Sequence, residues 1–85
     1  MNKDLESTMK FEGISEDRMS VSDALHFVNE ALLEKGYNPI NQIIGYILSG
    51  DSSYVTSYKN ARSIIKKFER DDNLEEILTH YLNRR

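Results

Sequence analysis

Apolar residues recur at helical spacing from residue 20 to the end of this chain, and polar residues fill the positions between them. Spacings of three and four residues place apolar side chains on one face of an α-helix. The pattern is interrupted near residues 36–38, 50–56 and 70–73. It therefore predicts an all-α fold, a small bundle of about four helices.

The first predicted helix begins at Ser20 or Ser22 and ends at Gly36. Ser20 stands three residues before Asp23, which is a variant of the capping box, where two side chains bond each other's backbone N–H groups. Gly36 can adopt the left-handed conformation that closes a helix. The apolar stripe of this helix comprises Val21, Ala24, Leu25, Val28, Ala31 and Leu32, and Leu33 falls outside it.

The second helix is predicted from Pro39 to Ser49, between the cap residue Asn38 and the stop residue Gly50. Asn is a strong N-cap, and Pro at the first helical position loses no hydrogen bond. At about 100° per residue the apolar side chains cover an arc of roughly 200°, wider than on an ordinary surface helix. We therefore expect burial on two sides, with Gly45 admitting a neighbouring backbone.

The third helix is predicted from about Ser57 to Arg70, and the fourth begins after a cap at Asp72 or Asn73, with Asp72 and Glu75 forming a capping-box-like pair. The third carries basic residues along one side at steps of three and four: Lys59, Arg62, Lys66 and Arg70. The fourth has an apolar stripe of Leu74, Ile77, Leu78, Tyr81 and Leu82.

Residues 1–19 show no helical period, and we interpret them as a flexible N-terminal tail, partly tethered by Phe11, that precedes a helical domain of residues 20–85. The first residues lack the apolar stretch of a signal peptide, and no later segment has membrane-spanning length. The chain has no cysteine, which fits a reducing compartment. We expect a soluble, cytoplasmic protein without membrane insertion.

The chain length and the net charge narrow the range of possible functions. A chain of 85 residues buries a smaller share of its surface than a larger domain, so dimerisation would add stability. The net charge of −3 disfavours a dedicated nucleic-acid binder. Residues 36–70 nevertheless hold two acids against five bases, so the basic charge is concentrated there. A nucleic-acid-binding helical protein that uses the basic face is therefore the alternative function.

Catalytic and metal-binding patterns are weak. His26 and Glu30 are four residues apart on one helical face, and His80 is the other imidazole. Two histidines without thiolates or a matched second pair make a poor ligand set. The sequence has no nucleophile elbow and no phosphate-binding glycine loop. We expect no enzyme activity, no metal and no cofactor.

One long block of the sequence resembles a known family. The block runs from Glu34 to Ile43 as Glu-Lys-Gly-Tyr-Asn-Pro-Ile-Asn-Gln-Ile, followed by Gly45-Tyr46 and Leu48-Ser49-Gly50-Asp51. It resembles the signature of the IreB family of regulatory phosphoproteins from Gram-positive bacteria. Further matches are Tyr54-Val55, Ala61-Arg62, the run Phe68-Glu69-Arg70-Asp71, and Tyr81-Leu82.

The resemblance implies a homodimeric cytoplasmic protein that is a substrate of a membrane-anchored Ser/Thr kinase, and of the phosphatase that opposes it. The resemblance also implies a role in the cell-envelope stress response, as a negative regulator of intrinsic antibiotic resistance. The regulator would act through a downstream protein whose identity the resemblance does not give. The Thr-hydrophobic-basic-Phe element of the family is matched by Thr8 to Phe11, so the resemblance places phosphorylation on Thr8. A second tail threonine of the family has no counterpart here, where residues 1–7 hold only Ser7.

Two surfaces follow as hypotheses. Phosphorylated Thr8 would dock on the basic face formed by Lys59, Arg62, Lys66 and Arg70, because phosphate forms charge-assisted hydrogen bonds with such groups. The wide apolar arc of the second helix, together with Leu33, would form the two-fold contact of a dimer. The predicted interface comprises Leu33, Ile40, Ile43, Ile44, Tyr46 and Ile47.

Overall fold

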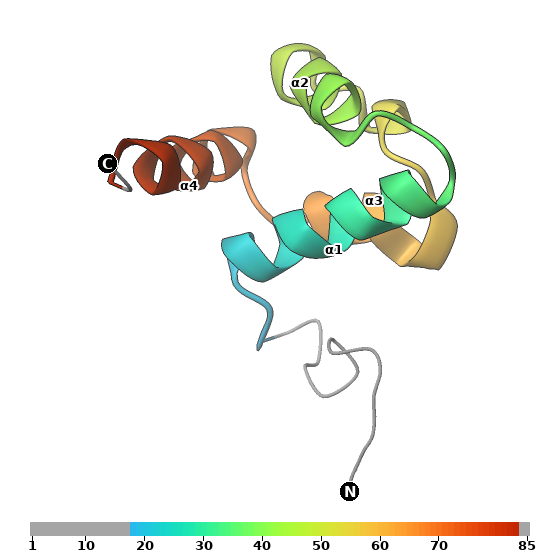
Figure 1. The fold of residues 1–85 in the computed structure, drawn as a ribbon, viewed down its shortest axis with the longest axis horizontal. Helices are drawn as coiled ribbons and strands as arrows, with labels where there is room; N and C mark the ends of the chain where they lie inside the picture. The colour runs from blue at the N-terminus through green and yellow to red at the C-terminus, as the bar shows by residue number, and fades with distance from the viewer. Residues whose placement is uncertain (1–17, 84–85) are drawn as a thin grey trace, which may run out of the picture.

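The computed structural model describes residues 18–83, and these residues are helical with no strand among them, as predicted (Figure 1). The four α-helices are α1 (Val21–Glu34), α2 (Pro39–Ser49), α3 (Ala61–Ile65) and α4 (Arg70–Leu82). Two short 3-10 helices, η3 (Ser52–Tyr54) and η4 (Tyr58–Asn60), lie between α2 and α3. In Figure 1, α1 crosses the middle of the molecule, and α4 extends away from the rest.

The helix α1 has the predicted capping box and the predicted stop. The Ser20 hydroxyl accepts a hydrogen bond from the Asp23 N–H at 3.0 Å, and the Ser20 N–H donates to the Asp23 carboxylate at 3.2 Å. At the other end Gly36 has a φ of +85°, which lets the Tyr37 N–H donate to the Leu32 carbonyl at 2.9 Å. The buried residues of α1 all belong to the predicted stripe: Ala24, Val28, Ala31 and Leu32.

The bounds of α2 are those predicted, but its expected burial on two sides is wrong. Asn38 caps the helix by accepting from the Asn41 N–H at 3.1 Å, and Gly50 closes it with a φ of +77°. Only Tyr46 of this helix is buried. Gly45 admits the Tyr54 ring rather than a backbone, because a Cβ there would lie 2.6 Å from two ring carbons.

The predicted third helix is also wrong, because the segment 57–70 is divided by two turns. Lys59 and Asn60 have positive φ values of 54° and 69°, and such residues cannot continue a right-handed helix. The chain therefore makes the 3-10 turn η4 before α3 begins at Ala61. After Ile65 the chain tightens again, with the Phe68 N–H bonded to the Ile65 carbonyl.

The helix α4 begins earlier than predicted. Glu69 is its N-cap without a side-chain capping bond, and Arg70 is its first residue. Asp71 and Asp72 lie in the first turn, where negative charge is favoured by the helix dipole. Asn73 is therefore not a cap. It lies inside the helix with no exposed surface.

The core consists of two clusters that share Phe27 at their edges. The larger cluster joins α1, α2 and α3 through Val28, Ala31, Leu32, Tyr46, Val55, Ala61 and Ile65. The smaller one joins Met19, Ala24 and Ile64, with Phe68 packed against it. Met19, assigned to the tail from the sequence, is thus 7% exposed and belongs to the folded body. The α4 residues contribute little to either cluster.

Candidate phosphate-docking, interface and cleft residues

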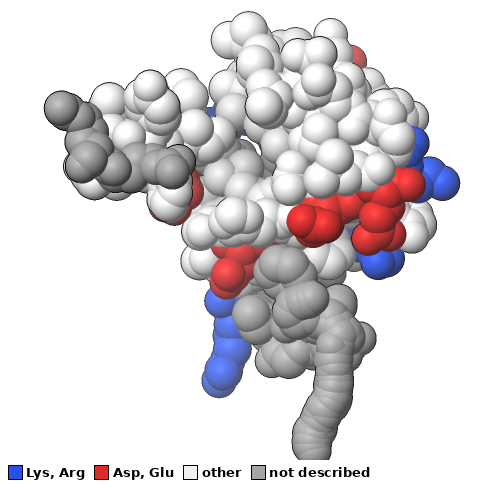
Figure 2. All heavy atoms as spheres, viewed as in Figure 1, with Lys and Arg blue, Asp and Glu red and all other residues white. Residues whose placement is uncertain are grey.

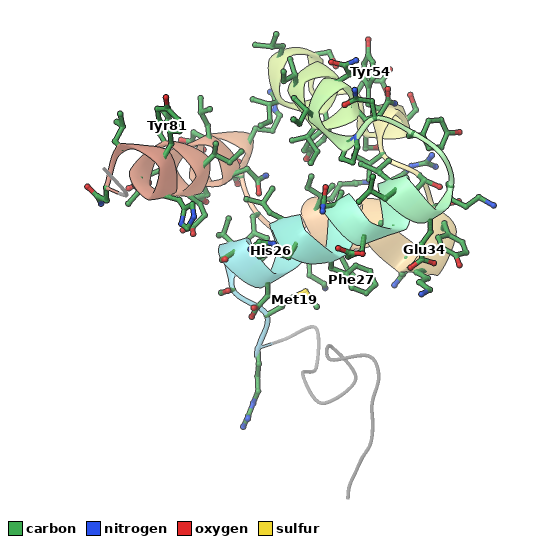
Figure 3. The ribbon with its side chains drawn as sticks, in the orientation of Figure 1. Met19, His26, Phe27, Glu34, Tyr54 and Tyr81 are labelled. Atoms are coloured by element: carbon green, nitrogen blue, oxygen red, sulfur yellow. The ribbon has the colours of Figure 1, made fainter. Side chains whose placement is uncertain are left out.

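The predicted phosphorylation site lies outside the described residues, and the structure begins its description at Arg18, ten residues after Thr8. The chain enters the folded body through Met19 and Ser20, at the N-terminal end of α1, where Met19 is labelled in Figure 3. A modified tail would therefore reach the rest of the molecule from this end of α1.

The first of the four predicted docking residues, Lys59, is held at the far end of α1. Its ammonium lies 3.3 Å from the Glu34 carboxylate and 5.5 Å from the centre of the Tyr58 ring. The Tyr58 hydroxyl donates to the same carboxylate at 2.9 Å. The hydrogen bonds from Tyr58 and Lys59 hold the pKa of Glu34 below its ordinary value, and the contact with Glu34 raises the pKa of Tyr58. Lys59 is thus already ion-paired.

The two arginines bind backbone carbonyls. The Arg62 Nε donates to the Val55 carbonyl at 2.8 Å. The Arg70 Nη1 donates to the Ile47 carbonyl near the C-terminus of α2 at 2.9 Å. These bonds occupy one donor of each guanidinium, which has five. Both side chains therefore fix the fold while keeping donors for another acceptor.

The four basic residues do not form the single helical stripe that the sequence predicted. Lys59 belongs to η4, Arg62 to α3, Lys66 to the cap after α3, and Arg70 to the first turn of α4. The broken segment 57–70 is the physical reason. Figure 2 shows Asp and Glu across the middle of the viewed face, with Lys and Arg beside them at the right-hand edge and below. Acidic groups therefore border the basic ones at this edge.

The predicted interface residues divide into exposed and packed groups. Leu33, Ile40 and Ile44 are 53%, 70% and 48% exposed. Ile43 and Ile47 are half-buried against the larger cluster, and Tyr46 lies inside it with 6% exposure. The first three are available to a partner, whereas Tyr46 is not.

Sequence reasoning missed a second exposed apolar surface. Leu48 is 79% exposed on α2, and the predicted apolar stripe of α4 is exposed along its length. A groove of about 410 Å³ between α2 and α4 is lined by Ile47, Leu48 and Leu74 together with Glu69, Arg70 and Asp71. The exposed large apolar residues of α4 are Leu74, Ile77, Leu78, Tyr81 and Leu82.

A separate cleft of about 310 Å³ lies between α1 and α4. Leu25, Ile77 and Tyr81 supply its apolar lining, and Ser22, His26, Glu76 and His80 supply its polar groups. Figure 3 labels His26 on α1 and Tyr81 on α4. His26 and His80 are the two histidines of the chain, so both imidazoles line one cleft. Within residues 18–83, no three metal-ligating side chains gather as a metal site would require.

The comparison with protein families decides the identity of the chain. Residues 6–83 match the family model described as IreB regulatory phosphoprotein. The chain belongs to the IreB family. It is 76% identical to a UPF0297 protein of Clostridioides difficile over 85 residues, covering 100% of both chains. It is 54% identical to a UPF0297 protein of Ruminiclostridium cellulolyticum over 78 residues, covering 92% of this chain and 89% of the relative.

Membership of the IreB family confirms the predicted resemblance and supports a regulatory role. The matched range includes Thr8, the basic residues of η4, α3 and α4, and the exposed apolar residues of α2 and α4. None of the helices in the described part of the chain is long and apolar enough to cross a membrane.

Proposed function

We propose that this protein is a non-enzymatic, cytoplasmic regulatory phosphoprotein whose Thr8 is modified by a membrane Ser/Thr kinase and restored by its phosphatase. It acts in the cell-envelope stress response as a negative regulator of intrinsic antibiotic resistance, through binding to a downstream protein. The observation that carries the proposal is the match of residues 6–83 to a family described as regulatory phosphoproteins.

The switch operates through charge. A phosphate on Thr8 adds about −1.5 to −2 charges at neutral pH. It docks on the basic groups Lys59, Arg62, Lys66 and Arg70, where the remaining guanidinium donors of Arg62 and Arg70 can form charge-assisted hydrogen bonds. Lys66 is exposed at the end of α3 and supplies a further charge. Amide chemical shifts of Arg62, Lys66 and Arg70 that do not respond to phosphorylation would contradict this docking.

Phosphorylation is tested with the kinase of the host organism and the purified full chain. Mass spectrometry should find one phosphate on Thr8, and Thr8→Ala should abolish it. Ser7→Ala, a hydroxyl removed one residue away, is the matched control and should leave the modification intact. Phosphate found on residues other than Thr8, with none on Thr8, would overturn the assignment.

The protein is a homodimer in this proposal, with α2 and α4 as its contact surface. A monomer rarely exposes a large contiguous apolar surface. Here Ile40 and Ile44 are exposed on α2, and Leu48 continues into the groove against Leu74. Leu78 and Leu82 extend the same side of α4, at four-residue steps from Leu74. A second copy placed on this surface would bury these side chains.

Sedimentation of Ile44→Asp tests the contact. Burying an Ile side chain contributes about 1.5–3 kcal/mol, so the charged variant should weaken dimerisation at least tenfold. Lys66→Asp places the same charge on another exposed position and should not change the dimer. A wild-type protein that remains monomeric at all concentrations would contradict the proposal.

The alternative of nucleic-acid binding gains no support from the described residues. Its basis was a continuous basic stripe, and that stripe is divided among three elements and partly engaged with Glu34 and backbone carbonyls. Strong nucleic-acid binding requires several simultaneous phosphate contacts.

A further inference from the structure

The cleft between α1 and α4 has no occupant among the described residues, although it is apolar and lies beside the point where the N-terminal segment joins the fold. We propose that Phe11 of the same chain docks in this cleft, against Leu25, Ile77 and Tyr81. The docking is a property of the unmodified protein. Its regulation by Thr8 rests on the function proposed above.

The length of chain outside the described residues permits this contact. Arg18 lies seven residues after Phe11 in the chain, and seven steps of an extended chain at about 3.3–3.6 Å each span at most roughly 25 Å. The α1 residues of the cleft are Ser22, Leu25 and His26, within the first two turns of the helix. At 1.5 Å per residue, His26 lies only about 8 Å along the axis from Val21. Phe11 can therefore reach the cleft without unfolding any described element.

The chemistry of the segment suits the cleft. A buried Phe ring removes about 150–250 Å² of surface from contact with water, and aromatic pairs add a favourable geometry with a ring such as that of Tyr81. Phe11 is flanked by Lys10 and Glu12. The Lys10 ammonium complements the Glu76 carboxylate, and the Glu12 carboxylate can accept a hydrogen bond from His26 or His80. Leu5, further from the body, has an acid on each side, Asp4 and Glu6, and so has no basic neighbour to meet Glu76.

Phosphorylation of Thr8 is expected to weaken the docking. Thr8 is three residues from Phe11, so its phosphate would come near the rim of the cleft. Glu76 is the one carboxylate in the lining, and the lining contains no Lys or Arg. Near Glu76 the added negative charge is unfavourable, whereas the basic groups of η4, α3 and α4 attract it. The N-terminal segment would then leave Leu25, Ile77 and Tyr81 free when Thr8 is modified.

Proton NMR of the two histidines tests the docking in the full chain. The chain has two histidines, so the spectrum contains two histidine Hε1 signals. Both imidazoles line the cleft, so each signal reports on the occupancy of the cleft. Phe11→Ala should move both signals beyond their line width, because an aromatic ring leaves their surroundings. Leu5→Ala removes a different apolar side chain of the segment and should move neither. Neither variant changes a residue of the described fold. Signals that ignore Phe11→Ala would overturn the proposal.

A spin label gives an independent measurement. The chain has no cysteine, so Ser7→Cys provides a single attachment site. The label should broaden the amide signals of Leu25 and Ile77, and Phe11→Ala should restore them. Broadening that appears only between labelled and unlabelled molecules in a mixture would overturn docking within one chain. If Phe11→Ala moves the histidine signals and phosphorylation of Thr8 does not, the docking stands and its regulation is refuted.

Discussion

Asn73 offers the sharpest test of the packing between α4 and the rest of the fold. Its side chain has no exposed surface, and neither its amide nitrogen nor its carbonyl oxygen has a hydrogen-bond partner in the structure. A buried polar group left unpaired costs about 1–3 kcal/mol. Leu has the same number of side-chain heavy atoms and the same branching, so it should fill the same space without that cost.

Asn73→Leu is therefore expected to raise the free energy of unfolding by about 1–3 kcal/mol. The better helix propensity of Leu adds a few tenths of a kcal/mol in the same direction. In a domain of this size each kcal/mol raises the melting temperature by about 4–8 °C. Urea unfolding at two protein concentrations measures the change and separates it from any effect on dimerisation.

Two further variants define what the result means. Asn73→Ala also removes the unpaired groups but leaves a cavity, so its gain should be smaller. Asn73→Asp keeps the shape and adds a charge, so it should destabilise the protein strongly. A loss of more than about 1 kcal/mol on Asn73→Leu would refute the reasoning. It would mean that the amide is hydrogen-bonded, through a water molecule or through residues outside the described range.

The other predictions concern Glu34 and Gly45. The pKa of Glu34 lies below its ordinary value of 4.5, so its stabilising contribution is present above that pH and is lost as the pH falls through the lowered pKa. Tyr58→Phe should raise the pKa of Glu34 in a carboxyl NMR titration, whereas Tyr37→Phe should leave it unchanged. If Tyr58→Phe does not change the titration, Lys59 alone lowers the pKa of Glu34. Gly45→Ala should destabilise the protein by up to about 2 kcal/mol, because the clash of the new methyl group with the Tyr54 ring exceeds the gain of about 1 kcal/mol in helix propensity. In urea unfolding, Gly45→Ala should cost less when Tyr54 is already Ala, and equal costs in both backgrounds would disprove the clash.

Local signals made α1 and α2 predictable. The Ser20 and Asp23 pair, the Asn38-Pro39 start and the two closing glycines act within a few residues, so their chemistry is visible in the sequence. The division of segment 57–70 was not visible, because a positive φ at Lys59 has no sequence signature and Asn60 alone is a weak one. Glu69 begins α4 without a side-chain capping bond, so no pattern marked that position.

Burial and the candidate sites depend on tertiary packing and were harder to predict. An apolar arc on α2 indicates that the helix has a partner, but it does not say whether the partner belongs to the same chain. Ile40 and Tyr46 both belong to that arc, and one is 70% exposed while the other is 6% exposed. The cleft joins His26 and His80, which are distant in sequence and lie on helices whose contact no periodicity reveals. Thr8 itself lies outside the described residues.

The larger core cluster draws all its buried members from the stretch between Val28 and Ile65. No residue of α4 is among these members, nor among the partly buried side chains packed against them. A protease cut between Lys66 and Glu69 would therefore leave every side chain of that cluster on the N-terminal fragment. What α4 adds to the remainder is its own set of contacts, such as the buried Asn73 and the Arg70 bond to the Ile47 carbonyl, and no part of the central cluster.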